Sequence, residues 1–294
     1  MNDATIKIVN FILGNKCNSN CSHCFSNSTS GSKAALSEKK AIEYAQIISQ
    51  NASIKEVHFN GGEPLLYHNT LEKIISIITA SRPVLIKIAT GAGEFESIER
   101  VEKILASISK IDEFWVSIDN YHLESISIQN YLNFDKVVRQ RNIPVVYSIC
   151  YRNLKEYTDT LTIIHENNLT HTRIAKQPVA SVGRGKNLDG LLKYEDSEIP
   201  KDYHCPETNV ATIWPNGRVS NCSAGAVREG LIQKYLSLDH FLTDNNSDSF
   251  YNERSTKSLR EIASDWGITG RAINITSPCS ACQTLLKLKQ AKLR

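Results

Sequence analysis

The chain has 294 residues, 41% of them hydrophobic, so it can bury a full core as one large α/β unit or as a barrel with a small domain. Its 34 basic and 31 acidic residues leave a formal charge of +3, without the charged arm of a nucleic-acid-binding or membrane-anchored protein. The N-terminus lacks a secretion-signal pattern, and no apolar run is long enough to span a bilayer. We therefore expect a cytoplasmic protein whose partners include neither nucleic acid nor membrane.

Strand and helix patterns alternate over the first two-thirds of the chain. Apolar runs predict strands at Thr5–Leu13, Glu56–Asn60, Val84–Thr90, Phe114–Asp119, Val145–Cys150 and Thr172–Gln177. Helical periodicity predicts helices at Ser37–Ser49, Leu71–Ala80, Glu96–Ser109, Tyr131–Arg141 and Leu154–Asn167. Six βα repeats favour a parallel sheet with outer helices, curled into an open barrel or doubly wound.

The pattern changes after residue 180. Ser181–Pro200 is rich in Gly, Lys, Asp and Pro and is interpreted as a linker. The turn Pro215-Asn216-Gly217 predicts a hairpin of Val210–Trp214 and Arg218–Asn221, with helices expected at Ile232–Leu242 and Leu259–Trp266 and a mobile loop at Asp244–Ser249. The expected domains are 1–180, a linker at 181–200, and 201–294.

Three of the eight cysteines form the sequence Cys17-x₃-Cys21-x₂-Cys24, in a loop directly after the first strand. In a reducing compartment, such a grouping indicates metal ligands rather than disulfides. Three thiolates without a nearby fourth suit a [4Fe-4S] cluster with one open iron, whereas zinc prefers four ligands. The alternative is a zinc site in which His23 supplies the fourth ligand.

This motif resembles the CxxxCxφC signature of the radical S-adenosylmethionine (SAM) superfamily, with His23 at the aromatic position φ. The resemblance covers about residues 5–180 and implies a partial (β/α)6 TIM-like barrel. It also implies that SAM binds the open iron and is cleaved to a 5′-deoxyadenosyl radical, with a flavodoxin or ferredoxin as reductant.

Gly61, Gly62, Glu63 and Pro64 follow the second strand and match the family's GGEP motif. Glycines let the backbone approach a ligand closely, and a carboxylate beside exposed carbonyls can hold an ammonium group. The resemblance therefore implies that this segment binds the amino group of SAM. Taken alone, the segment is equally typical of a turn that opens a helix.

Polar residues at the ends of later strands are further candidates for binding SAM, because α/β proteins gather ligand groups there. Similar enzymes bind the SAM ribose and carboxylate with such groups, which here are Ser117, Asp119 and Ser148. Arg184 could bind a carboxylate or be a solvated linker residue. Cys150, at the end of the fifth strand, is either a small buried apolar residue or a thiol that exchanges hydrogen atoms with a radical.

Cys205, Cys222, Cys279 and Cys282 form a second group of four thiolates, able to hold zinc or a fully ligated cluster. The pattern Cys…Gx₄C…CxxC after such a barrel resembles the Twitch form of the SPASM extension. It implies a small C-terminal Twitch/SPASM-like domain with one auxiliary [4Fe-4S] cluster, and a structural zinc remains the alternative.

Enzymes with this extension mostly modify ribosomally made peptides, and short segments here resemble the peptide epimerases, including Asp119-Asn-Tyr121-His122. The hydrogen-donating cysteine of that group corresponds to Ser223, and its acidic partner falls near Asn209 or Val210. We therefore expect hydrogen abstraction followed by oxidation or crosslinking of a peptide, as part of the biosynthesis of a ribosomally made, modified peptide.

Three alternatives remain open. They are an aminocyclitol or sugar dehydrogenase or epimerase, a peptide epimerase with a different hydrogen donor, and a non-catalytic iron-sulfur or zinc protein. The barrel begins close to Met1, which leaves no room for an N-terminal leader-peptide-binding domain. We therefore expect a peptide substrate to be held by the barrel mouth and the second domain, or by a separate leader-binding protein.

Overall fold

The computed structural model describes residues 6–169, 173–191, 204–223, 230–232, 234–244, 249–268 and 278–292. An eight-stranded sheet runs through it in the order β6-β5-β4-β3-β2-β1-β7-β8. The strands are β1 (Ile8–Ile12), β2 (Glu56–Asn60), β3 (Leu85–Thr90), β4 (Glu113–Ser117), β5 (Val145–Tyr151), β6 (Arg173–Pro178), β7 (Val210–Ile213) and β8 (Val219–Ser220). No helix within these ranges is long and apolar enough to cross a membrane.

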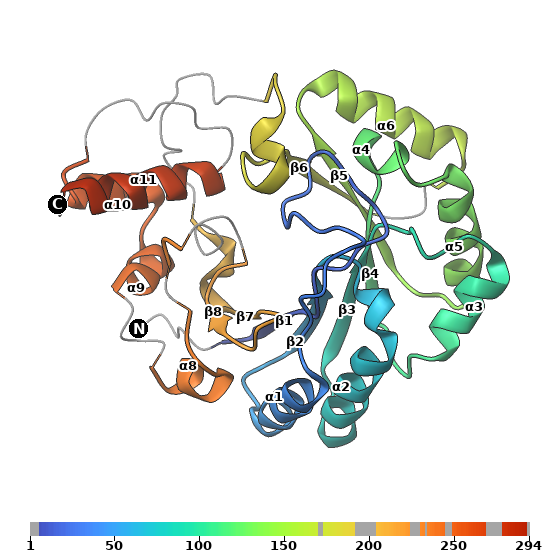
Figure 1. Ribbon diagram of the computed structural model, residues 1–294, viewed down its shortest axis with the longest axis horizontal. Coiled ribbons are helices and arrows are strands. Elements are labelled where there is room, and N and C mark those ends of the chain that lie inside the picture. The colour runs from blue at the N-terminus through green and yellow to red at the C-terminus, as the bar shows by residue number, and fades with distance from the viewer. Residues whose placement is uncertain are drawn as a thin grey trace.

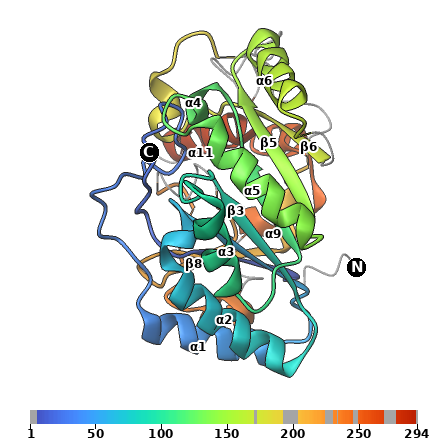
Figure 2. The same cartoon turned by 90° about the vertical axis from the view of Figure 1, so that its right-hand side faces the viewer.

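Strands β1 to β6 are all parallel and lie in chain order. A doubly wound sheet would reverse its strand order near the middle, so this topology is that of an open barrel. The helices α1, α2, α3, α5 and α6 cover the outer side of the curved sheet (Figure 1). Seen from that side, α2, α3 and α5 lie across the strands (Figure 2). The partial (β/α)6 barrel is thus confirmed.

The barrel helices begin at polar capping residues. They are α1 (Glu38–Gln50), α2 (His68–Ser81), α3 (Ile98–Ala106), α4 (Asn120–Leu123), α5 (Ile128–Gln140) and α6 (Leu154–Glu166). Ser37, Ser97, Ser127 and Asn153 each accept a backbone N–H of the following first turn, as does Asp119 before α4. These caps set the residues at which α1, α3, α4, α5 and α6 begin.

Successive side chains along each strand point alternately to the hydrophobic core, which lies between the sheet and the helices, and to the interior of the barrel. In β2, Val57 and Phe59 are fully buried in the main hydrophobic core, whereas Glu56, His58 and Asn60 are half-buried. His58 and Asn60 line an interior cavity. Because side chains alternate across a strand, one face packs on the helices and the other leaves polar groups inside the barrel.

The C-terminal part continues the same sheet. Strand β7 pairs in parallel with β1, and β8 forms the predicted antiparallel hairpin with β7. The later helices are α8 (Leu238–Asp244), α9 (Ser249–Thr256), α10 (Leu259–Asp265) and α11 (Pro278–Lys292), gathered beside β7 and β8 (Figure 1). Helices α9, α10 and α11 enclose a second hydrophobic cluster, whereas α8 packs on the main core. The domain limits at 180 and 200 stay a prediction.

Some element limits differ from the sequence prediction. The fourth strand ends at Ser117 because Asp119 caps α4. The helix expected from Ile232 begins at Leu238, since Tyr235 exchanges backbone hydrogen bonds with Val219. Within the proposed linker, η2 (Gly183–Asn187) is a short 3-10 helix, and residues 192–200 lie outside the described residues. The loop expected at Asp244–Ser249 likewise lies mostly outside them.

Candidate active site

The Cys17–Cys24 loop begins just past the carboxyl end of β1 and is held by backbone hydrogen bonds. Cys17 N donates to Thr29 O at 3.1 Å, and Cys24 N donates to Cys21 O at 3.1 Å. Arg184 of η2 braces the loop from outside, because its Nε donates to Cys21 O at 2.8 Å and its Nη1 to Ser28 O at 2.9 Å. Arg184 is therefore attached to the cysteine loop rather than being a solvated linker residue.

The Gly61–Pro64 segment is joined to the start of this loop. Gly62 N donates to Gly14 O at 2.8 Å, and Glu63 N donates to Lys16 O at 2.9 Å. A Cβ on Gly62 would lie 2.2 Å from Lys16 O, and Gly61 has a φ of 142°, so both positions require glycine. Close backbone packing thus fixes the GGEP segment one residue away from Cys17.

Glu63 is 1% exposed and accepts three hydrogen bonds. Leu65 N donates to Oε1 at 3.2 Å, while Thr90 Oγ1 and Gly91 N donate to Oε2 at 3.0 and 3.1 Å. Burial raises the pKa of Glu63 to about 7, although these donors oppose the shift. The carboxylate thus ties β2 to β3 and is close to changing its charge at neutral pH.

The three loop thiols fit a metal cluster. Burial raises the pKa of Cys17 to about 11, and the charges of Glu63, Cys21 and Cys24 raise it further. Thiols that raise one another's pKa in this way become thiolates together only when a cation such as an iron-sulfur core compensates their charge. The donor set of three soft ligands therefore suits the open [4Fe-4S] cluster predicted from the sequence.

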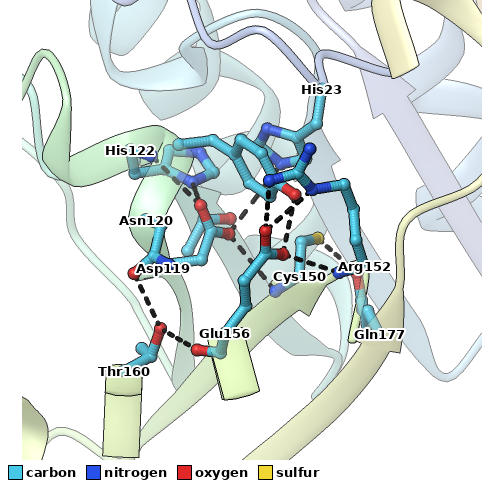
Figure 3. Close-up of polar contacts among 12 residues, drawn as sticks. His23, Asp119, Asn120, His122, Cys150, Arg152, Glu156, Thr160 and Gln177 are labelled. Carbon is cyan, nitrogen blue, oxygen red and sulfur yellow. Dashed lines mark hydrogen bonds and ion pairs between the residues drawn. The ribbon is translucent and has the colours of Figure 1, made fainter. Parts of the chain in front are cut away.

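His23 does not join the cysteines but faces the loop after β4 (Figure 3). Its ring stacks on Tyr121 with centroids 4.5 Å apart and meets His122 edge-on at 5.1 Å. Its Nε2 lies 3.8 Å from Asp119 Oδ2. Burial lowers the pKa of His23 to about 4, so the ring is neutral. This packing is not that of a fourth zinc ligand.

Asp119 is completely buried, and three nitrogen atoms from two residues lie within hydrogen-bonding distance of its carboxylate (Figure 3). Its Oδ1 accepts His122 N at 3.0 Å and lies 2.8 Å from His122 Nδ1, and its Oδ2 accepts Cys150 N at 3.2 Å. Burial lowers the pKa of His122, but Asp119 and a hydrogen bond with the Cys21 thiol raise it well above its usual value. Asp119 and His122 thus form a buried ion pair beside Cys21.

A second set of contacts supports this loop from α6. Tyr121 Oη donates to Glu156 Oε2 at 2.8 Å, and Arg152 Nε donates to Glu156 Oε1 at 2.7 Å (Figure 3). Cys150 lies beside the same loop, packs with Cys21 and Cys24 in one cluster, and has its Sγ 3.8 Å from Gln177 Oε1. Burial raises the pKa of Cys150 well above its usual value, so the thiol keeps its hydrogen.

A cavity of about 310 Å³ occupies the barrel interior next to this cluster. Ser117 and Ser148 stand opposite each other on β4 and β5 and line it, together with Gln177, which contacts Cys150. At the other end lies a charged group: Lys87 Nζ is 2.7 Å from Glu56 Oε2 and 3.8 Å from Glu113 Oε1. The cavity therefore offers polar groups to a ligand, and Gln177 connects it to Cys150, which clusters with Cys21 and Cys24.

The four remaining cysteines gather at the C-terminal cluster. Cys205 precedes η3 (Pro206–Asn209), Cys222 follows β8, and Cys279 and Cys282 lie on α11. Burial raises the pKa of Cys282, the charges of Cys222, Cys205 and Cys279 add to the shift, and Arg254 opposes it. Four thiols close enough to shift one another, in an apolar setting, suit a fully ligated metal centre.

Sequence reasoning placed the cysteines and the GGEP segment next to one another but missed the groups around them. Arg152, Glu156 and Arg254 carried no motif, and Lys87 and Trp115 lie inside ordinary strand patterns. Lys87 and Trp115 could have been predicted only from the alternation of side chains along β3 and β4, which directs every second residue into the barrel. Ser117 and Ser148 face the cavity, whereas the Asp119 carboxylate is directed at His122 and Cys150.

An open βα barrel with three clustered thiols at the end of its first strand defines an enzyme scaffold that holds a cluster at its mouth. The sequence model of the radical SAM superfamily matches residues 11–175. The chain therefore belongs to the radical SAM superfamily and is a radical SAM enzyme, and this family uses SAM and a [4Fe-4S] cluster.

The chain is similar to the putative peptide biosynthesis protein YydG of Bacillus subtilis, with 23% identity over 233 residues, covering 76% of this chain and 71% of YydG. It shares the fold of Streptococcus suis SuiB, solved with its precursor peptide SuiA, at a TM-score of 0.60 and 14% identity, covering 86% of this chain and 67% of SuiB. It also shares the fold of BtrN, solved with AdoMet and 2-DOIA, at a TM-score of 0.51 and 15% identity over 93% of this chain and 96% of BtrN.

Proposed function

We propose that this enzyme abstracts hydrogen from a ribosomally made peptide and converts it to an oxidised or crosslinked product. The observation that carries the proposal is the polar barrel cavity, whose lining residue Gln177 contacts Cys150, in a chain similar over most of its length to a putative peptide biosynthesis protein. When bound, SAM and its cluster supply a 5′-deoxyadenosyl radical that abstracts the hydrogen atom.

Each part of the site has a proposed task. Cys17, Cys21 and Cys24 hold the cluster, and Gly61–Pro64 presents backbone oxygens to the amino group of SAM. Ser117 and Ser148 face the cavity and are placed to donate to the ribose or carboxylate of SAM. Asp119 keeps His122 and the Cys150 backbone in position, and Arg184 keeps the cysteine loop closed.

The cavity would take the part of the peptide that reacts. Trp115 lies in its wall, and its Nε1 donates to Glu113 Oε1 at 2.7 Å, which holds the indole at the charged end of the cavity. Lys87 pairs with Glu56 and Glu113 there, and Arg173 also pairs with Glu113, so two cations balance the two carboxylates. Such a lining favours a neutral or aromatic side chain over a charged one.

We further propose that Cys205, Cys222, Cys279 and Cys282 hold an auxiliary [4Fe-4S] cluster in a Twitch-like unit. Oxidation of the substrate leaves an electron to be removed, and such a cluster is an electron-accepting centre. The eight cysteines, seven of them grouped in two sets of metal ligands, suit a reducing, cytoplasmic location. A flavodoxin or ferredoxin is the proposed reductant, and a separate leader-binding protein is a possible further component.

The experiment is an anaerobic incubation of the reconstituted enzyme with SAM, dithionite and the peptide encoded by a short neighbouring reading frame. We expect 5′-deoxyadenosine and a peptide that has lost two hydrogens. An unchanged peptide in the presence of 5′-deoxyadenosine would contradict a peptide substrate and point to a small molecule. Absence of 5′-deoxyadenosine from a fully loaded enzyme would contradict the assigned SAM site.

One observation favours a second function, epimerisation with a different hydrogen donor. Ser223 occupies the position of the donor expected from the epimerases, but Cys150 keeps its S–H and lies beside Cys21. In this mechanism the Cys150 thiol gives a hydrogen atom to the peptide radical, and the resulting thiyl takes one electron from the reductant and one proton from solvent. The peptide mass then stays constant in H₂O, and one deuterium enters in D₂O after exchange of the thiol.

Cys150→Ala separates the two functions. If the enzyme oxidises or crosslinks its peptide, this variant should keep SAM cleavage and product formation within about twofold, since it removes only a small group from the cluster of buried residues. If the enzyme epimerises its peptide, inversion should be lost while SAM cleavage continues. Cys150→Ser, which keeps the size of the side chain but has a stronger bond to hydrogen, is the matched control.

A further inference from the structure

Helix α9 carries a fully buried cation into the C-terminal cysteine group. Arg254 is 2% exposed, although its guanidinium stays charged at any ordinary pH. Its Nη1 lies 3.5 Å from Cys205 Sγ, and its Nη2 donates to the backbone oxygen of Asn221, next to Cys222. The guanidinium therefore contacts a ligand sulfur and also the strand end that carries a second ligand.

The surroundings make this charge effective. Cys222 is 5% exposed and packs in an apolar cluster with Trp214, Phe250 and the buried face of α11. Phe250, on the same helix as Arg254, contacts Trp266 with ring centroids 5.6 Å apart. Because the effective dielectric constant inside such a cluster is far below that of water, a charge at contact distance changes the energy of a thiolate centre strongly.

We propose that Arg254 tunes the four-cysteine centre by raising the reduction potential of the auxiliary cluster, and so makes it an electron acceptor. This inference rests on the proposed auxiliary cluster. A [4Fe-4S] core held by four thiolates carries a net negative charge, which grows by one unit when the core takes up one electron. No bond to the protein changes in this step, so a fixed cation alone favours the reduced state.

Two observations assign this role to Arg254 rather than a purely structural one. The Nη1 of Arg254 lies 3.5 Å from Cys205 Sγ, and its Nη2 donates to the backbone oxygen of Asn221, so the charge lies beside Cys222 as well as Cys205. Arg184 at the other cysteine loop donates to the backbone oxygens of Cys21 and Ser28. Arg254 thus contacts a ligand sulfur in addition to a backbone oxygen, whereas these contacts of Arg184 are with the backbone.

The test measures the potential directly, without any peptide substrate. A variant with Cys17, Cys21 and Cys24 replaced by alanine keeps only the C-terminal centre, which is reconstituted and analysed for iron, sulfide and zinc. In this background, redox titration followed by EPR measures the midpoint potential of the centre in three further variants, Arg254→Gln, Arg254→Lys and Arg82→Gln. Arg82 is the matched control, because it also donates to backbone oxygens, those of Ile54 and Ile48, in the distant α1–α2 region.

We expect Arg254→Gln to lower the midpoint potential by at least 59 mV, which is a tenfold change in a one-electron equilibrium. Arg254→Lys should shift it less, and Arg82→Gln should leave it unchanged. An unchanged potential in a fully loaded Arg254→Gln protein would overturn the inference. If Arg254→Gln does not bind a cluster, the result for Arg254→Lys decides. Cluster binding by Arg254→Lys would support a role for the positive charge, and failure of Arg254→Lys to bind a cluster would overturn the proposed role.

The metal analysis keeps this inference separate from the proposed function. Zinc in place of iron and sulfide, with Arg254 intact, would contradict the auxiliary cluster itself. Iron and sulfide with a potential insensitive to Arg254 would leave the cluster in place and refute only the role of the arginine.

Discussion

The two cysteine groups are built in opposite ways. Cys17, Cys21 and Cys24 come from a single loop, and the backbone of Gly14–Lys16, the GGEP segment and Arg184 hold that loop in place. The C-terminal cysteines come from three separate segments, enclosed by apolar side chains and a buried arginine. Three ligands leave a coordination position for a substrate-like ligand, whereas four ligands close the centre. Under the proposed function, this difference assigns bond cleavage to the first centre and electron transfer to the second.

The largest expected effect comes from removing a ligand of the open centre. Cys21→Ala should abolish formation of 5′-deoxyadenosine, reducing it by at least about 10³-fold, because the family chemistry depends on this cluster. High-performance liquid chromatography of the quenched reaction measures it. Iron content should fall by one cluster per chain. Substantial SAM cleavage by this variant would contradict the assignment of the Cys17–Cys24 loop.

Removing a ligand of the closed centre should separate the two activities. Cys282→Ala is expected to lose one cluster's worth of iron and to stop product formation, while SAM cleavage without substrate stays within about threefold of the wild type. Cys282 is on α11, away from the cysteine loop, so its loss leaves the GGEP contacts intact. Equal loss of both activities would show that the second group is needed to fold the first.

The glycine contacts of the first loop predict a smaller effect. Gly62→Ala places a methyl group 2.2 Å from Lys16 O, so the loop must shift. Such crowding should lower the free energy of unfolding by about 1–3 kcal/mol and weaken SAM binding. Gly31→Ala is the matched control, since a Cβ at Gly31 meets nothing within 4 Å. Urea denaturation and equilibrium dialysis with SAM report the two quantities, and equal behaviour of both variants would argue against the close packing.

Glu63 predicts the mildest effect, a dependence of SAM affinity on pH. Its pKa is about 7 in the protein without SAM, and the nearby ammonium group of SAM would lower it. Binding below pH 7 must then release a proton, so the dissociation constant for SAM should rise as the pH falls, by up to about tenfold per unit. Glu63→Gln should remove this dependence. Isothermal titration calorimetry at pH values about one unit below and about one unit above that pKa measures it.

The comparison of the two groups also shows what sequence could predict. The first group could be predicted because its ligands are close in sequence and follow a strand. The alternation of strands and helices predicted the parallel barrel around it. The role of Asp119 could not be predicted from the sequence. Its place at a strand end suggested a ligand contact, but its carboxylate is directed at His122 and Cys150, and only tertiary packing determines this.

Arg254 illustrates the same limit more strongly. It lies on α9 far along the chain from Cys205, and nothing in its neighbourhood distinguishes it from a solvated arginine of a polar helix. Its burial follows from the packing of α9 between η3 and α10, which brings together segments that share no local pattern. Contacts of this kind depend on long-range packing that periodicity and motifs do not encode.

The central claim is that one chain holds an open and a closed iron-sulfur centre. Its most direct test is anaerobic analysis of iron, sulfide and zinc in three reconstituted proteins: the wild type, the variant without Cys17, Cys21 and Cys24, and the variant without the four C-terminal cysteines. The account predicts iron and sulfide for about two [4Fe-4S] clusters in the wild type, one in each variant, and SAM cleavage by the last variant but not by the second. One cluster together with one zinc ion in the wild type would contradict it.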